Sequence, residues 1–124
     1  MRTFVFILLV TLLVGCFDNQ SVNSSEEIEF GALYSVIISS NLPTISNGNL
    51  IIKVSYSGCN DGHEFELKNR TVNSAAELWL FKLTEDQPCD AYFEEEKTFN
   101  LSESILSSEK IVLITPTDDR IELN

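Results

Sequence analysis

Basic residues are scarce in this sequence. Eight lysines and arginines stand against 19 aspartates and glutamates, so the formal net charge is −11. Phosphate backbones and anionic lipid headgroups repel a chain of this sign, and nucleic-acid binding is therefore disfavoured. The acidic excess indicates solubility first, with binding of a cation or of a basic partner as the alternative interpretation.

Residues that commonly bind metals or perform catalysis are also few. The chain has one histidine, His63, and three cysteines, none of them in a Cys-x-x-Cys pair. Zinc requires roughly three or four ligands, and calcium roughly six to eight oxygens. Glu94-Glu95-Glu96 alternates its side chains if extended, so at most two carboxylates share a face. Phosphate-binding glycine loops and the Gly-x-Ser-x-Gly nucleophile motif are absent. We therefore predict no metal site and no cofactor.

His63 has two possible roles. It lies two residues after Asp61, so it could act as a general base that Asp61 orients. However, the segment His63–Lys68 alternates apolar and charged residues, which places His63 on the inward face beside Phe65. We favour a packed histidine that bonds to backbone or to a carboxylate, and we predict that the protein is not an enzyme.

The longest apolar run is too short to cross a bilayer. Phe4–Val14 spans about 11 residues, whereas a membrane-spanning helix needs about 20. Its length fits the hydrophobic region of a signal peptide. The run ends in Leu13-Val14-Gly15-Cys16, which resembles the lipobox of bacterial envelope lipoproteins. A plain secretory signal and an uncleaved anchor helix are the alternatives.

The lipobox resemblance implies a lipid anchor. Signal peptidase would recognise Leu13, Val14 and Gly15, and the Cys16 thiol would carry the diacylglyceryl group before cleavage. Two or three fatty-acid chains such as palmitate hold a protein firmly to a membrane, whereas one chain does not. Because Phe17 rather than Asp follows Cys16, a retention signal for the inner membrane is absent. We expect a cell-envelope protein, in the outer membrane if the host is Gram-negative.

The mature chain is long enough for one domain. Removal of residues 1–15 takes Arg2 away and leaves 109 residues with a net charge of −12. Residues 16–27 are polar and without periodicity, so they are predicted to form a flexible tether that starts at the lipidated cysteine. Residues 28–124 form the predicted domain.

Short alternating segments predict the fold class of that domain. In Leu50–Ser57 every second residue from Leu50 is apolar, and the other face carries Ile51 with three polar residues. Asn47-Gly48 before this segment is a strong hairpin signal. We expect an all-β fold, an antiparallel β-sandwich of about seven or eight short strands. The segments with further predictions are Ile28–Ser39 (one or two strands, with Gly31 as a bulge), Glu77–Leu83 (a buried strand, or a helix capped by Ser74), Tyr92–Leu101 (a strand), Ser102–Ser108 (a turn or one helical turn), and Ile111–Thr115 with Arg120–Leu123 (strands).

Cys59 and Cys89 remain once Cys16 is assigned to the lipid. In an exported chain two such cysteines are expected to form a disulfide, because the compartment is oxidising. Free thiols or half of a metal site are the alternatives. A disulfide would make the loops Gly58–Gly62 and Glu85–Ala91 neighbours, and loops on rigid sandwiches often carry recognition.

Four short motifs together resemble those of one protein group: Tyr56-Ser57-Gly58-Cys59, His63-Glu64-Phe65-Glu66-Leu67, Cys89-Asp90-Ala91 and Phe99-Asn100-Leu101-Ser102. The group comprises small uncharacterised bacterial envelope lipoproteins, common among Bacteroidota, with a Gly-Cys…His-x-Phe-x-Leu segment and a later Cys before Phe-Asp-Leu-Ser. The resemblance covers about Leu50 to Leu101, and this chain differs by Asn100 in place of Asp and by an apparent insertion at Gly62. It implies the fold and no activity.

The sequence thus predicts a lipid-anchored, non-catalytic binding or structural-interaction module of unknown ligand, whose partners are the membrane, through the lipid, and an envelope protein or ligand. Two alternatives stay open. One is an inhibitor of an envelope hydrolase, and the other is a small enzyme that uses His63 and Asp61.

Overall fold

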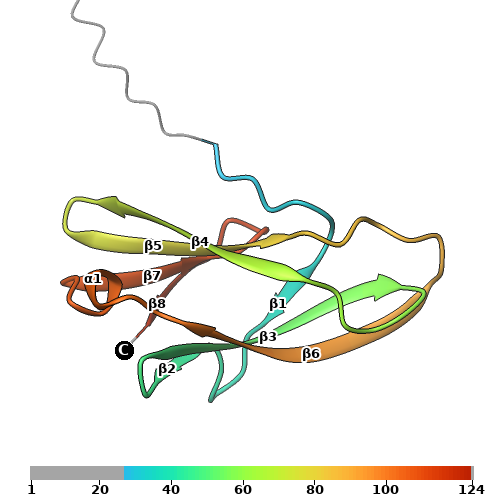
Figure 1. Cartoon of the computed structure of the whole chain (residues 1–124), viewed down its shortest axis with the longest axis horizontal. Coiled ribbons are helices and arrows are strands. Elements are labelled where there is room, and N and C mark those ends of the chain that lie inside the picture. The colour runs from blue at the N-terminus through green and yellow to red at the C-terminus, as the bar shows by residue number, and fades with distance from the viewer. Residues whose placement is uncertain (1–26, 124) are drawn as a thin grey trace, which may run out of the picture.

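The computed structural model describes residues 27–123. They form two four-stranded sheets and one short helix (Figure 1). The elements are β1 (Ser35–Ile37), β2 (Thr44–Ser46), β3 (Asn49–Gly58), β4 (Phe65–Val72), β5 (Ala75–Lys82), β6 (Ala91–Asn100), α1 (Glu103–Leu106), β7 (Lys110–Ile114) and β8 (Arg120–Leu123). The predicted all-β sandwich of short strands is confirmed.

The first sheet is built on β3. The strand β6 pairs with β3 along its whole length, from Gly58 opposite Ala91 to Asn49 opposite Asn100. A strand has two edges, so β1 and β2 share the other edge of β3, each over three residues. Asn47 and Gly48 have φ values of 51° and 75° in the turn between β2 and β3. The predicted hairpin is therefore confirmed, because both residues adopt the positive φ that such a turn requires.

The second sheet has the order β4-β5-β7-β8. Five of the six strand pairs in the two sheets are antiparallel, but β5 and β7 run parallel. The chain leaves β5, passes through β6 in the other sheet and returns as β7, and a crossover of this kind permits parallel pairing. The strand predicted at Glu77–Leu83 is confirmed as β5. The helix alternative is wrong, because Ser74 lies in the turn before β5 with a φ of 65°.

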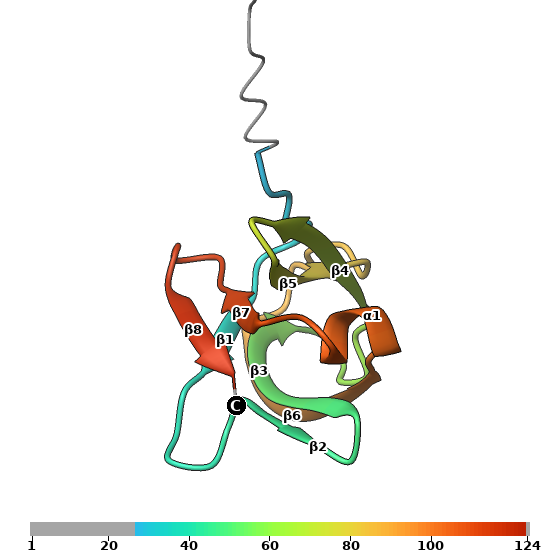
Figure 2. The ribbon, with the colours of Figure 1, turned by 90° about the vertical axis from the view of Figure 1, so that its left-hand side faces the viewer.

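The core lies between the two sheets. Alternation in β3 buries Leu50, Ile52 and Val54 completely, and alternation in β5 does the same for Leu78 and Leu80. Burial of a side chain of this size contributes about 1.5–3 kcal/mol. Figure 2 shows α1 beside the curved β3 and β6 at one end of the sandwich.

The single helical turn predicted after β6 is confirmed as α1. Ser102 caps it, because its hydroxyl accepts a hydrogen bond from the Ile105 amide at 3.4 Å. Ile105 is buried in the core, so the turn is held by packing as well as by its cap.

The segment Ile28–Ser39 forms one strand, Ser35–Ile37, as predicted. The bulge predicted at Gly31 is wrong, because Gly31 forms an isolated parallel bridge to Lys82. Gly31 has a φ of 74°, and a Cβ at this position would lie 2.3 Å from the Lys82 carbonyl oxygen. This close approach of two backbones is what requires glycine.

The strand β6 carries charges on both faces. Glu94 and Glu96 are exposed, whereas Glu95 and Lys97 are only partly exposed and share the inward face with the half-buried Phe93. Within residues 27–123 the second edge of β6 pairs with no strand. Inward-pointing charges on such an edge oppose edge-to-edge association, which gives a physical reason for charges in a strand.

Candidate functional site

The disulfide between Cys59 and Cys89 joins two loops at one end of the sandwich. The Cα atoms of the two residues lie 4.7 Å apart, and the bond confirms the predicted pairing. Cys59 follows β3 directly, and Cys89 lies two residues before β6. The Cys59 amide also donates to the Gln87 side-chain oxygen at 2.7 Å. The loops after β3 and after β5 are therefore neighbours, as expected.

His63 is packed against Tyr56 in this region. Its side chain is buried, with 1% of the residue exposed, and the two rings are stacked with centroids 4.1 Å apart. The His63 Nε2 atom lies 3.1 Å from Gln87 Oε1, and Nδ1 has no hydrogen-bond partner among the described residues. The packed histidine is confirmed, but its partner is a side-chain amide rather than backbone or a carboxylate.

Asp61 does not orient His63. Asp61 is exposed, and neither imidazole nitrogen bonds to it in the part of the chain that the structure describes. Asp61 and His63 are two residues apart in the sequence, but they do not make the contact that a general base and its orienting carboxylate need.

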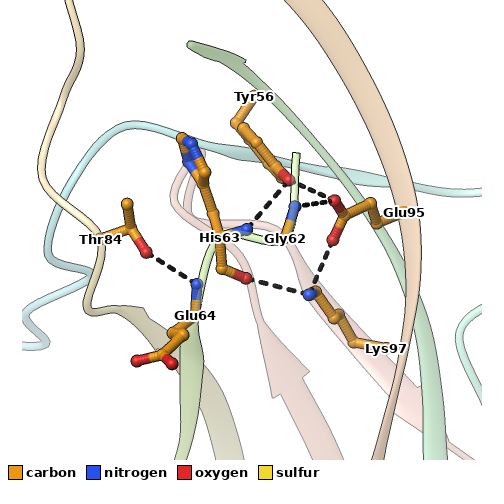
Figure 3. A network of polar contacts seen from close by, with 7 residues as sticks. All are labelled: Tyr56, Gly62, His63, Glu64, Thr84, Glu95 and Lys97. Carbon is orange, nitrogen blue, oxygen red and sulfur yellow. Dashed lines mark hydrogen bonds and ion pairs between the residues drawn. The ribbon is translucent and has the colours of Figure 1, made fainter. Parts of the chain in front are cut away.

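A polar network connects β6 with the loop before β4 (Figure 3). The carboxylate of Glu95 accepts hydrogen bonds from the Tyr56 hydroxyl and the Gly62 amide, both at 2.5 Å, and lies 2.7 Å from the Lys97 ammonium. Lys97 in turn donates to the His63 carbonyl oxygen at 2.9 Å. Every charge that this network buries has an opposite charge or a hydrogen-bond partner.

The network sets the pKa of two groups. Burial acts to raise the Glu95 pKa, but the bonds from Lys97, Tyr56 and Gly62 outweigh it and lower the pKa to about 2. Burial, followed by the bond to Glu95, raises the pKa of Tyr56. At neutral pH Glu95 is therefore ionised and Tyr56 keeps its proton, so the Tyr56 hydroxyl can donate to the Glu95 carboxylate.

Lys82 is a further buried charge that the sequence pattern did not single out. It is 1% exposed, donates from Nζ to the Leu33 carbonyl oxygen at 3.1 Å, and lies 4.7 Å from the centroid of the Tyr56 ring. Burial lowers its pKa, and the charge of Asp86 acts in the opposite direction. Its position in β5 has the same parity as the core residues Leu78 and Leu80, and this parity could have identified it as inward-facing.

A hollow of about 440 Å³ lies over Tyr56, and we call it the Tyr56 hollow. Two apolar side chains stand at its rim with large exposed fractions, 78% for Leu33 and 63% for Tyr92. Asp86 and Asp90 also line it, and Asp86 accepts a hydrogen bond from the Leu33 amide at 3.1 Å. The hollow thus combines a rigid floor, two exposed apolar anchors and two carboxylates, a composition that suits binding.

The residues predicted for lipidation lie outside the described part. These are Leu13, Val14, Gly15 and Cys16, together with most of the tether at 16–27. Of the described residues, none belongs to a helix with the length and hydropathy needed to cross a bilayer. The described residues also contain no group of three or more His, Cys, Asp or Glu placed to hold a metal ion.

Comparison with known proteins gives no relative. No protein family, no curated protein and no solved structure matches this chain.

Proposed function

We propose that this protein is a lipid-anchored component of the cell envelope whose sandwich domain binds a partner without catalysing a reaction. The Tyr56 hollow is the proposed binding surface. The single observation that carries the proposal is the exposure of Leu33 and Tyr92 on the rim of a hollow whose floor is held by a disulfide. Exposed aromatic and aliphatic side chains around a hollow are frequent anchors in protein interfaces.

The rigidity of the floor supports this function. The Cys59–Cys89 disulfide, the stacked His63 and the Glu95 network fix the two loops before any partner arrives. A surface that is already ordered loses little conformational entropy on binding, so more of the contact energy is left for affinity. The same residues do not form a base with its orienting carboxylate, which favours binding over catalysis.

The anchor part of the proposal is supported by the lipobox resemblance. Ten residues separate Cys16 from Glu27. A chain of this length spans at most about 40 Å, so a lipid on Cys16 would hold the domain close to the bilayer. A binding domain held at a membrane surface meets membrane-associated partners at a raised effective concentration.

Two measurements test the two parts separately. For the anchor, the Cys16→Ser variant should lose its fatty-acid mass and move from the membrane fraction to the soluble fraction of native cells. For the surface, a photo-crosslinking residue at position 92 should form a defined adduct in intact cells. The same residue at Leu106 in α1, which lies at the opposite end of the sandwich (Figure 1), serves as the control.

The outcomes that would contradict the proposal are distinct. A Cys16→Ser chain that still sediments with membranes contradicts the anchor. Equal adducts at positions 92 and 106, or a position-92 adduct that a Leu33→Asp substitution leaves unchanged, contradict the Tyr56 hollow as the binding surface. Turnover of an envelope substrate by the purified protein would contradict the absence of catalysis.

A further inference from the structure

A second hollow lies on the outer face of the other sheet. The core residues of β5 alternate with Trp79 and Phe81, which therefore point away from the core and are only half-buried. Across the strand pair Trp79 lies opposite Lys68, and Phe81 lies opposite Glu66. These four side chains line a hollow of about 580 Å³, which we call the Trp79 hollow.

The remaining wall of the Trp79 hollow comes from the start of the described chain, which lies on the β4–β5 side of the sandwich in both ribbon views (Figures 1 and 2). Glu27 and Glu29 line the hollow from this segment. The segment is held in place because the Lys82 amide donates to the Phe30 carbonyl oxygen at 2.9 Å. The backbone that carries the two carboxylates is therefore held beside the aromatic floor.

The charges in this hollow are unbalanced. Three carboxylates and one ammonium line it, and Lys68 lies 3.2 Å from Glu66, so these two charges offset each other. Glu27 and Glu29 are exposed and have no ion pair within the described residues. Arg70 lies beside Trp79 outside this lining and is paired with Glu77 at 2.9 Å. The carboxylates of Glu27 and Glu29 therefore give the lining a negative excess beside two aromatic rings, which repels anions.

An indole ring next to carboxylates favours a cation. Trp is the side chain whose ring attracts cations most strongly, and attraction is effective within about 6 Å of its centroid. The chain itself gives an example, because the Arg70 guanidinium lies 5.7 Å from the Trp79 centroid while its Nε donates to Glu77. A lysine or arginine side chain has an apolar stem that can cover Phe81 and a cationic head that can reach Glu27 and Glu29.

We propose that the Trp79 hollow binds a lysine or arginine side chain of a basic segment in a partner protein. Charge complementarity selects this occupant, because a chain with a net charge of −11 attracts basic polypeptides at long range. The site is separate from the Tyr56 hollow and does not depend on the function proposed for it.

Trp79 is the only tryptophan of the chain, so its intrinsic fluorescence reports on this hollow. The full chain is titrated with the peptide acetyl-Gly-Lys-Gly-Lys-Gly-amide at about 0.15 M ionic strength, and Trp79 fluorescence is followed. We expect a saturable change. The same peptide with both lysines acetylated at Nζ should bind roughly tenfold more weakly or not at all, because it has the same stem without the charge.

Matched charge variants distinguish binding in the Trp79 hollow from nonspecific electrostatic attraction to the acidic chain. The double variant Glu27→Gln and Glu29→Gln should weaken binding of the lysine peptide roughly tenfold. The control double variant, Glu103→Gln and Glu109→Gln, removes the same charge from exposed positions in and just after α1 and should change the affinity less than about twofold. Absence of saturation, equal binding of the acetylated peptide, or equal weakening by the control variant would each overturn the proposal.

Discussion

The imidazole of His63 is stacked on the phenol ring of Tyr56, with centroids 4.1 Å apart and planes inclined by 17°. The Tyr56 ring is also 5.9 Å from Phe93 and 6.0 Å from Phe65. The loop that carries His63 is therefore held to the core by a ring contact as well as by the disulfide at Cys59. This relationship makes the only histidine of the chain a structural residue, and its removal has a predictable cost.

His63→Ala is expected to lower the free energy of unfolding by about 2–4 kcal/mol, because it removes a fully buried ring and leaves a cavity beside Tyr56. Urea denaturation of the variant and the wild type measures this difference. Asp61→Ala is the matched control, and because Asp61 is exposed its effect should stay within about 0.5 kcal/mol. A His63→Ala protein with full stability would contradict the packing role.

The variant Glu95→Gln tests the polar network through the pH dependence of the free energy of unfolding. The folded pKa of Glu95, about 2, lies below its ordinary value of 4.5. The stability that this carboxylate contributes is therefore fully present above about pH 4.5 and is lost as the pH falls from there toward 2. We expect the variant to be about 2–3 kcal/mol less stable than the wild type at pH 7 and nearly equal to it at pH 2.

The control for this prediction is the neighbouring Glu94→Gln, which removes an exposed carboxylate paired with Lys53 at 3.3 Å. An exposed pair contributes about 0–1 kcal/mol, so this change should be small at either pH. Denaturant curves at several pH values give both comparisons. A loss in Glu95→Gln that is the same at pH 7 and pH 2 would show that packing, and not the charge, explains the effect.

The variants Gly31→Ala and Gly62→Ala distinguish the cost of a positive φ from the cost of a steric contact at the new Cβ atom. Both glycines have positive φ, 74° and 72°, so alanine is strained at either position. Only at Gly31 would the new Cβ meet other atoms, since it would lie 2.3 Å from the Lys82 carbonyl oxygen, whereas nothing lies within 4 Å at Gly62. We expect losses of about 1–2 kcal/mol for Gly62→Ala and clearly more for Gly31→Ala, measured by thermal unfolding. Equal losses would contradict the close approach at Gly31.

The sequence predicted the fold where local patterns and tertiary packing agree. The alternation in Leu50–Ser57 and the Asn47-Gly48 turn specify β3 and its hairpin by themselves, because side-chain period and positive φ are local properties. The parallel pairing of β5 with β7 was not predicted, because sheet order depends on contacts between segments far apart in the chain. The sequence pattern also predicts a bulge at Gly31 in place of its bridge to Lys82, because Lys82 is distant in sequence.

The candidate site could be predicted only in part. The Cys59–Cys89 pair and the inward position of His63 followed from cysteine count and strand alternation. The hollow over Tyr56 could not be foreseen, because Leu33 and Tyr92 come from segments that only the folded sheet brings together. Surface residues carry no periodic signal that distinguishes a binding anchor from an ordinary exposed side chain.

The disulfide provides the last prediction. Because Cys59 and Cys89 are 30 residues apart, their bond restricts the unfolded chain by an amount that corresponds to about 3–4 kcal/mol on the chain-entropy estimate. The double variant Cys59→Ser and Cys89→Ser should lose stability of this size in urea denaturation. Its loops should also exchange their amide hydrogens faster, first at Cys59 and Gly62, whose amides donate to Gln87 and Glu95.

The core strands give the internal control for that experiment. The amides of β3 and β5 belong to the two sheets and should exchange through global unfolding, so their protection should fall only by the overall loss of stability. If the loop amides and the strand amides lose protection by the same factor, then the disulfide acts on the unfolded chain alone. In that case the Glu95 network and the His63 stacking hold the floor of the Tyr56 hollow without it.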